Sequence, residues 1–140
     1  MATVGVGIIV LNGEGKILVI KRKGGHAPYY SIPGGRLEDG ETFKECAVRE
    51  IKEETNIDIS NPEVIAVTNN LQTYRNEGVH FISIVLLARR FSGTPEIMEP
   101  DKCGELLWVD PDNLPMPHFD ASQKAVECYL GNYFYKEYSR

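Results

Sequence analysis

The apolar residues of this chain alternate with polar ones, or run together, in segments that have the length of strands. Residues 3–11 and 16–22 lie near the start, and the polar sequence Asn-Gly-Glu-Gly between them is typical of a turn. Residues 64–71 and 79–90 are rich in β-branched and apolar side chains, which favour extended structure. We expect this second pair of strands to be joined by a polar turn around residues 75–78.

A helical period replaces the alternation in the segment that follows Thr42. This segment contains no Gly or Pro, and its apolar stripe repeats every four residues. Thr42 followed by Glu45 is the signature of a capping box, and Asn56 tolerates the left-handed conformation that often follows a last turn. These signals predict a helix over residues 43–55. Its apolar stripe consists of Phe43, Ala47 and Ile51.

The second half of the chain predicts fewer regular elements. Residues 91–103 combine Gly, Pro and acidic residues and indicate a loop, whereas residues 106–110 have the composition of a short strand. Residues 121–133 repeat apolar side chains at a helical spacing and predict a second amphipathic helix. Strands that surround one helix and precede another are typical of an α/β fold with a mixed sheet between helices.

The composition indicates a single globular domain. The chain has 140 residues, of which 42% are hydrophobic and 25% are charged, which is ordinary for a protein that buries its own core. No apolar run is long enough for a membrane span, and the net charge of −5 argues against a nucleic-acid polymer as a partner. The three cysteines show no paired spacing, so we expect a reducing, cytoplasmic setting without a structural disulfide.

Three carboxylates occupy one side of the predicted helix. Glu50, Glu53 and Glu54 fall within a single turn, beside the apolar stripe rather than opposite it. Like charges at the edge of a buried face repel each other and lose hydration, so they either take up protons or bind a cation. Mg²⁺ favours such oxygen ligands. An acidic face exposed to solvent is the alternative.

A longer pattern of fixed spacings surrounds these carboxylates. Gly35 is followed after five residues by Glu41, and after seven more by Arg-Glu-Ile-Lys-Glu-Glu-Thr-Asn-Ile at residues 49–57. This pattern resembles the Nudix box of the Nudix hydrolases, which has a Gly, a Glu, and Arg-Glu-apolar-x-Glu-Glu-x-Gly-apolar at the same spacings. Every fixed position matches except Asn56, which stands where the family has Gly.

The resemblance implies both a fold and a reaction. The fold is the Nudix α/β/α sandwich, with a mixed β-sheet between helices, as one domain over residues 1–140 with its box at residues 35–57. Members of the family cleave a nucleoside diphosphate that is linked to another group, by metal-assisted attack of water on phosphorus. By resemblance, Mg²⁺ or Mn²⁺ is held by Gly35 through its carbonyl and by Glu50, Glu53 and Glu54.

Other acidic and basic residues are candidates for supporting roles in catalysis. One of the box glutamates, or a carboxylate on a later loop, is expected to orient or deprotonate the attacking water. Glu99 and Glu105 are the loop candidates, and a plain exposed acid is the alternative for both. Arg49 is expected to pair with Glu41 or to fix a ligand carboxylate, because its guanidinium suits bidentate contacts.

Residues outside the helix are candidates for substrate binding. Arg22, at the end of a basic strand, is expected to contact phosphate, and Gly34 permits close approach of the backbone. Phe119 is a candidate to stack on a base, and Asp120 or Ser122 to hydrogen-bond the edge of that base. The alternatives are that Phe119 belongs to the core and that Asp120 caps the last helix.

The resemblance favours a MutT-type nucleoside triphosphate diphosphatase. Such an enzyme converts a (deoxy)nucleoside triphosphate, including oxidised or otherwise modified ones, to the monophosphate and pyrophosphate. A dinucleoside polyphosphate hydrolase, acting on diadenosine tetraphosphate, is an alternative because Tyr74 lies near where such Nudix enzymes carry a tyrosine. ADP-ribose hydrolases tend to have a proline in that neighbourhood, which this chain lacks. A non-catalytic nucleotide-binding module is the alternative from another class, although such modules typically lose box glutamates.

The expected partner is a small-molecule nucleotide. The aromatic C-terminal tail is predicted either to pack within the fold or to contact a second copy of the chain in a homodimer.

Overall fold

The structure, a computed structural model, describes residues 1–137. Along the chain the elements are β1 (Thr3–Val10), β2 (Ile17–Arg22), β3 (Tyr30–Ser31), β4 (Gly34–Arg36), α1 (Phe43–Thr55), β5 (Asp58–Ser60), β6 (Glu63–Asn69), α2 (Leu71–Glu77), β7 (Phe81–Ala88), β8 (Arg90–Ser92), β9 (Cys103–Val109) and α3 (Asp120–Gly131). The last three residues of the predicted domain lie outside the described residues.

The central sheet has the strand order β4-β1-β7-β6. Strands β1 and β7 run parallel, from Thr3 opposite Phe81 to Val10 opposite Ala88. Strands β4 and β6 are antiparallel to their neighbours, so the sheet is mixed, as predicted. A further sheet has the order β3-β2-β9, and β5 pairs with β8. Parallel neighbours need a long crossover connection, and the chain between β1 and β7 supplies α1 within it.

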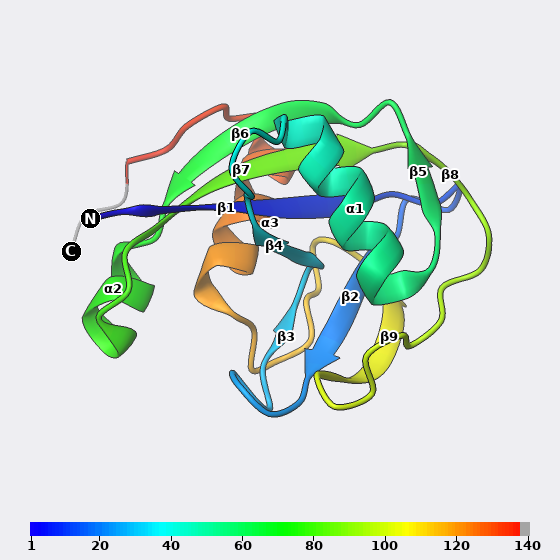
Figure 1. Cartoon of the computed structure of the whole chain (residues 1–140), viewed down its shortest axis with the longest axis horizontal. Helices are drawn as coiled ribbons and strands as arrows, with labels where there is room; N and C mark the ends of the chain where they lie inside the picture. Colours follow the sequence, from blue (N-terminus) through cyan, green and yellow to red (C-terminus); the bar gives the residue numbers. More distant parts are fainter. Residues whose placement is uncertain (138–140) are drawn as a thin grey trace.

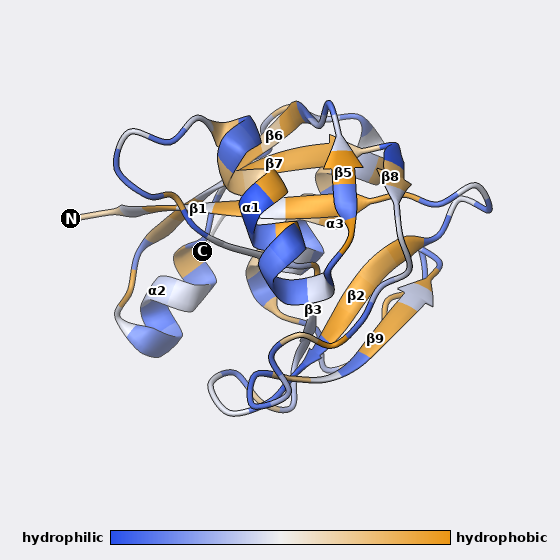
Figure 2. Ribbon diagram, turned by 45° about the vertical axis from the view of Figure 1, so that its right-hand side comes forward, coloured by the Kyte–Doolittle hydropathy of each residue, from blue (hydrophilic) through white to orange (hydrophobic). Residues whose placement is uncertain are grey.

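Alternate residues of the central strands pack against helices on opposite faces of the sheet (Figure 1). Ile8 of β1 belongs to the same core cluster as Ile51 of α1. Ile9, the next residue along the strand, instead belongs to the cluster that contains Ala125 of α3. Figure 2 shows hydrophobic strands between helices whose outer surfaces are largely hydrophilic. The predicted α/β fold, with a mixed sheet between helical layers, is therefore confirmed.

Helix α1 begins and ends where its sequence signals predict. The Thr42 hydroxyl accepts a hydrogen bond from the backbone N–H of Glu45 at 3.0 Å, and the Glu45 carboxylate accepts one from the N–H of Thr42 at 2.9 Å. Asn56 follows the last turn with a left-handed φ of 62°. In the apolar stripe, Ala47 and Ile51 are buried, whereas Phe43 in the first turn is largely exposed.

The connection between β6 and β7 is not the predicted polar turn. Residues 71–77 form α2, so β6 ends at Asn69 instead of continuing to Leu71. The segment contains no Gly or Pro that would interrupt a helix. Gly78 ends α2 with a φ of 75°, and its N–H donates to the carbonyl of Tyr74 at 2.8 Å. The Gly therefore marks the end of a helix, and the hairpin interpretation was wrong.

Short strands account for other departures from the predicted elements. Strand β8 lies at the start of the predicted 91–103 loop, where Phe91 pairs opposite Ile59 of β5. Three residues are too few to display an alternating pattern. The second predicted helix is confirmed as α3, which begins and ends within about two residues of the predicted bounds.

The described part of the C-terminal tail packs along the central sheet. The N–H of Val67 in β6 donates to the carbonyl of Phe134 at 2.9 Å, so the backbone of the tail pairs with this strand, whereas the side chains of Tyr133, Phe134 and Tyr135 are about half exposed. The cysteines Cys46, Cys103 and Cys128 are free and buried. No helix among residues 1–137 is both long and apolar enough to cross a membrane.

The left-handed position after α1 predicts how substitutions at Asn56 affect stability. Replacing Asn56 with Gly should keep the free energy of unfolding within about 0.5 kcal/mol of the parent, because both residues accept a positive φ. Replacing Asn56 with Ala should lower it by about 1 kcal/mol, because Ala lacks the short polar side chain whose local hydrogen bonds make the left-handed conformation acceptable to Asn. Urea unfolding of the two variants measures the difference, and equal stabilities would contradict the capping role.

Candidate active site

The glycine pair of β4 brings its backbone close to β1 on one side and to α1 on the other. Gly34 and Gly35 lie opposite Gly7 and Val6 of β1. A Cβ atom on Gly34 would collide with the carbonyl oxygen of Val6, and a Cβ atom on Gly35 would collide with the carboxylate of Glu50. Only glycine permits both approaches. The sequence Gly-Gly therefore sets a carboxylate of α1 directly against the β4 backbone.

Glu50 and Glu54 form a partly buried carboxylate pair on successive turns of α1. Glu54 accepts a hydrogen bond from the N–H of Gly34 at 3.0 Å. Burial and the adjacent charge of Glu50 raise the pKa of Glu54 to about 8, although the Gly34 N–H and the charge of Arg22 act in the opposite direction. Burial also raises the pKa of Glu50. The protein by itself therefore disfavours two negative charges here.

Arg49 lies at the edge of this pair and contacts the carboxylates of both Glu41 and Glu50. Its Nε and Nη2 atoms donate to the two oxygens of Glu41 at 2.7 and 2.9 Å, so the predicted pairing of Arg49 with Glu41 is confirmed. Its Nη1 atom also donates to Glu50 at 2.8 Å. The hydrogen bonds from Arg49 lower the pKa of Glu41 to about 2. Arg49 thus orients Glu50 while two of its nitrogen atoms are held by Glu41.

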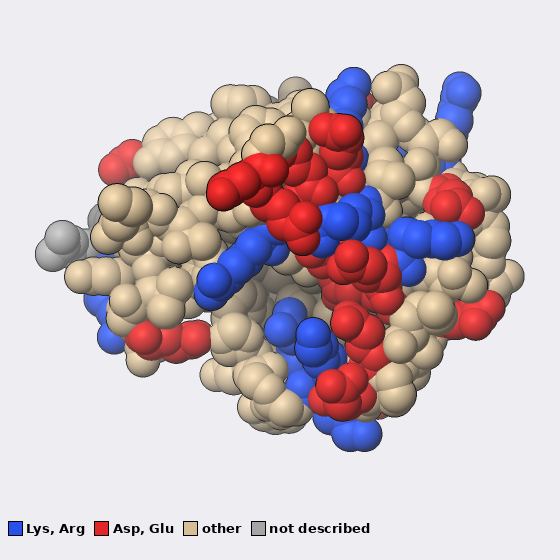
Figure 3. Space-filling view, in the orientation of Figure 1, with Lys and Arg blue, Asp and Glu red and all other residues tan. Residues whose placement is uncertain are grey.

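Glu53 lies on the outer side of the same turn. Its side chain is 53% exposed, and one oxygen lies 3.4 Å from Nη1 of Arg49. Figure 3 shows acidic side chains gathered over α1, with basic side chains among and below them around a hollow. Among the predicted metal ligands, the structure brings Gly35, Glu50 and Glu54 together, and it leaves Glu53 at the rim.

A cavity of about 360 Å³ opens beside the buried pair. We call it the acidic cavity, and its charged lining residues are Arg22, Arg36, Glu50, Glu54, Glu99 and Lys102. Of the two loop acids predicted from the sequence, Glu99 lines this cavity. Glu105 instead points to Lys21, with 3.8 Å between carboxylate and ammonium.

A second cavity, of about 310 Å³, lies between the central sheet and the helices α2 and α3. The cavity exists because Gly5 and Gly7 of β1 have no side chains to fill it. They lie on the same face of the strand as Ile9, which packs toward α3. A Cβ on Gly5 would meet only ordinary contacts, such as Phe81 at 3.7 Å. Its volume is in the range of small-molecule sites, about 300 to 1,000 Å³.

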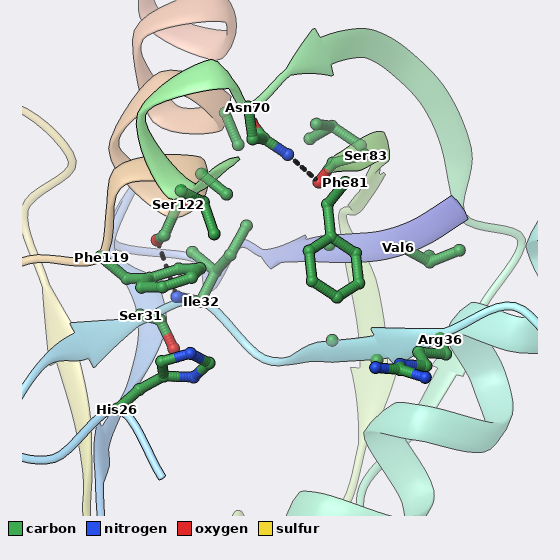
Figure 4. A pocket seen from close by; sticks show the side chains of 18 of the residues that line it. Val6, His26, Ser31, Ile32, Arg36, Asn70, Phe81, Ser83, Phe119 and Ser122 are labelled. Carbon is green, nitrogen blue, oxygen red and sulfur yellow. Dashed lines mark hydrogen bonds between the residues drawn. The ribbon is translucent and has the colours of Figure 1, made fainter. Parts of the chain in front are cut away.

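Aromatic rings form two sides of this second cavity, which we call the aromatic cavity (Figure 4). His26 and Phe119 lie together on one side, with their ring centroids 4.8 Å apart. Phe81 lies on the other side, and the guanidinium of Arg36 is 5.6 Å from the centroid of its ring. Rings arranged in this way can stack on a planar ligand.

The acidic and aromatic cavities adjoin each other at β4. Arg22, Gly34, Gly35 and Arg36 line both of them. A ligand that passes this boundary would meet aromatic rings at one end, cations and glycine backbone in the middle, and carboxylates at the other end. The predicted substrate-binding residues Arg22, Gly34 and Phe119 all lie along this path.

The other candidate binding residues take different positions. Asp120 lines a neighbouring cavity, and its carboxylate lies 3.4 Å from the ammonium of Lys124. Phe119, rather than Asp120, occupies the N-cap position of α3, and it makes no side-chain cap bond. The Ser122 hydroxyl accepts a hydrogen bond from the N–H of Ile32 at 2.8 Å and is thereby engaged within the protein. Tyr74 is half exposed on α2 and lines neither the acidic nor the aromatic cavity.

Sequence reasoning missed several residues of the aromatic cavity. Gly5 and Gly7 had a signal, because two glycines at a spacing of two leave a gap on one face of a strand. No sequence signal pointed to Asn70 or Phe81, since their positions depend on α2 and on the parallel register of β7.

The donor set fits a hard divalent cation. Within residues 1–137, no group of three or more His, Cys, Asp or Glu side chains is already arranged as a metal site. Glu50 and Glu54 nevertheless line one cavity with Glu99, and their raised pKa values show that, without a cation, the protein favours the protonated form of these two groups. A cation that binds oxygen ligands would favour the charged form of both groups.

Comparison with known proteins places this geometry in a family. A model of the NUDIX domain family matches residues 1–128. A Bacillus subtilis protein named "Putative 8-oxo-dGTP diphosphatase" is 34% identical over 116 residues, which cover 83% of this chain and 72% of that protein. An ADP-ribose pyrophosphatase of Methanocaldococcus jannaschii is 35% identical over 124 residues, which cover 86% and 69%.

A solved structure agrees in its fold over nearly the same length. The crystal structure of a MutT NUDIX hydrolase from Burkholderia pseudomallei matches with a TM-score of 0.82 and 33% identity. The match covers 91% of this chain and 97% of that chain.

The raised pKa of Glu54 predicts how stability depends on pH in metal-free protein. The unfolded chain loses the Glu54 proton near pH 4.5, whereas the native protein keeps it up to about pH 8. The native state therefore binds more protons in this interval, and the free energy of unfolding should fall as pH rises through it. Urea unfolding in EDTA measures this slope. Replacing Glu54 with Gln should flatten it, and an unchanged slope would contradict the assignment.

Proposed function

The chain belongs to the Nudix hydrolase family, and we propose that it is a MutT-type nucleoside triphosphate diphosphatase. Nudix hydrolases act on the phosphoanhydride bond of a nucleoside diphosphate linked to another group. The proposed reaction converts a (deoxy)nucleoside triphosphate, including oxidised or otherwise modified ones, to the monophosphate and pyrophosphate. We also propose that the protein works in the cytoplasm.

The observation that carries this proposal is the junction of the two cavities at β4. A nucleotide has a planar base at one end and a chain of phosphates at the other. The aromatic cavity suits the base, and Arg22 and Arg36 at the junction suit the first phosphates. The remaining phosphates would then reach the acidic cavity, where Lys102 also lies. Each part of the proposed substrate therefore meets side chains of matching chemistry.

We assign the metal to the carboxylates of α1. Nudix hydrolases generally need divalent cations, and Glu50, Glu54 and the Gly35 carbonyl would hold Mg²⁺ or Mn²⁺ here. Glu53 would complete the set from the rim of the cavity. When bound, such a cation supplies charge neutralisation for phosphate oxygens and for developing charge in phosphoryl transfer.

The residues of this chain would orient the reactants. Arg49 holds Glu50 in place and is itself held by Glu41, so both act as positioning residues. Water adds to a phosphorus atom, and the bridging oxygen leaves with the electron pair of the broken P–O bond. Glu99, which faces Glu50 and Glu54 across the acidic cavity, is our candidate to orient the water or accept its proton.

ADP-ribose is the second candidate substrate. The relative from Methanocaldococcus jannaschii is as similar to this chain as the one from Bacillus subtilis, so the relatives do not favour either substrate. A further cavity also adjoins the aromatic one at His26, Thr73 and Phe119, but it lies at the proposed base end and not beyond the phosphates, so it favours neither substrate. Diadenosine tetraphosphate gains no support from the position of Tyr74.

Turnover of a panel of nucleotides tests the proposed function. We expect Mg²⁺-dependent release of pyrophosphate from dGTP, oxidised dGTP or dCTP, with the monophosphate as the second product. Release of AMP and ribose 5-phosphate from ADP-ribose, at a higher kcat/KM than for any triphosphate, would favour the second candidate. No turnover of any member, diadenosine tetraphosphate included, would contradict the enzyme assignment.

Charge-neutral variants of the box carboxylates should lose activity while they remain folded. Replacing Glu53 or Glu54 with Gln should each lower kcat by about 100- to 1,000-fold, because a lost ligand charge weakens transition-state stabilisation. Glu105→Gln is the matched control, because Glu105 points away from the acidic cavity. Steady-state kinetics decides, and a Glu54→Gln variant as active as the Glu105→Gln control would remove Glu54 from the site.

Filling the gap in β1 should block the proposed base site. Replacing Gly5 with Val places methyl groups in the aromatic cavity and should raise KM about 10-fold or more. The fold should tolerate Val because Gly5 lies in a strand, where β-branched residues are favoured. Gly5→Ala is the graded control and should have a smaller effect. Equal KM values for the parent and the Val variant, with unchanged Tm, would place the base elsewhere.

A further inference from the structure

Two buried hydroxyl groups in the aromatic cavity have no hydrogen-bond partner among the described residues. They belong to Ser31 in β3 and Thr73 in α2, and each residue is only 3% exposed. Both residues line the aromatic cavity, and Ser31 is labelled among its lining side chains in Figure 4. A buried hydroxyl without a partner is unfavourable, because folding removes its hydrogen bonds to water.

Other polar side chains of the same cavity are paired within the protein. Asn70 donates to the Ser83 hydroxyl at 2.8 Å and accepts a hydrogen bond from Thr68 at 3.0 Å. Ser122 is also engaged, through Ile32. The fold therefore satisfies most polar groups in this cavity. Ser31 and Thr73 are exceptions that need an explanation, and a bound ligand provides one.

The surrounding charges limit which part of a ligand these hydroxyls meet. In the described part of the chain, no Asp or Glu lines the aromatic cavity. Its Arg residues, Arg22 and Arg36, lie at the boundary that it shares with the acidic cavity. Phosphates therefore belong at that boundary, and a neutral planar group belongs between the aromatic rings.

From this arrangement we infer that Ser31 and Thr73 are specificity-determining residues whose hydroxyls hydrogen-bond the polar edge of the nucleobase. The inference rests on the proposed function, because it takes the ligand to be a nucleotide. A hydroxyl both donates and accepts hydrogen bonds, whereas a carboxylate only accepts them. The pair therefore meets either a ring N–H or a carbonyl oxygen, and it accommodates bases whose edge has been altered by oxidation.

Removing each hydroxyl tests the inference. Ser31→Ala and Thr73→Val should each lower kcat/KM for the best nucleotide of the panel about 3- to 10-fold, as expected for one lost hydrogen bond, and should do so through KM rather than kcat. The Tm of the ligand-free protein should not fall, because neither hydroxyl has a partner to lose. Ser122→Ala is the matched control, and its Tm should fall because the N–H of Ile32 loses its acceptor.

A substrate without a base shows which part of the ligand the hydroxyls contact. With deoxyribose 5-triphosphate, the parent and the Ser31→Ala and Thr73→Val variants should have equal kcat/KM values. The same loss as with the complete nucleotide would place the contact on sugar or phosphate and overturn the inference. Unchanged KM values with the complete nucleotide would also overturn it. A fall in Tm like that of Ser122→Ala would show that the hydroxyls are structural.

Calorimetry separates this inference from the proposed function. Binding of the nucleoside monophosphates to the parent and the two variants needs no turnover. If the parent hydrolyses no nucleotide but binds a monophosphate more tightly than the variants do, the proposed function fails and base recognition stands. Equal affinities in all three proteins would overturn base recognition whatever the turnover assay shows.

Discussion

The site depends on two carboxylates of α1 that lie against the backbone of two glycines in β4. Glu50 and Glu54 face β4 from α1, and Gly34 and Gly35 are the residues that let the backbone come so near. Such closeness is unfavourable for two negative charges in a buried place, as the raised pKa of each group records. The capping box fixes where α1 begins. The fold therefore holds together two carboxyl groups that favour the protonated form, and a bound cation would allow both to ionise.

The contacts of Arg49 determine how far its positive charge can offset a negative charge on Glu50. A guanidinium next to two carboxylates would be expected to neutralise both, but two of its nitrogen atoms are bound to Glu41. Glu41 thereby becomes a strong acid, while the pKa of Glu50 stays raised despite its contact with Nη1. The pairing thus orients Glu50 without neutralising it fully. A lysine at position 49 would have a single point charge and could not divide its contacts in this way.

Local signals predicted the helix and its partners better than they predicted the cavities. The ends of α1 and the contact of Arg49 with Glu41 follow from spacing along one helix, which a sequence shows directly. The sequence does not show directly whether Glu99 or Glu105 lines the acidic cavity, because this depends on where β9 begins relative to β2. The α2 helix was predicted as a turn for a similar reason. A Gly such as Gly78 is common both after the end of a helix and in the turn of a hairpin, so the local sequence did not distinguish the two.

The two cavities share one property, which is that the protein leaves polar groups unsatisfied on both sides of β4. In the acidic cavity these are the carboxyl groups of Glu50 and Glu54, whose ionised form the protein disfavours, and in the aromatic cavity they are the hydroxyls of Ser31 and Thr73. Elsewhere in the same walls, Asn70 and Ser122 are paired, so poor packing does not explain the pattern. Unsatisfied groups cost stability. Because these hydroxyls and carboxyl groups belong to residues that line two adjoining cavities, we infer that a ligand, rather than the fold, completes them.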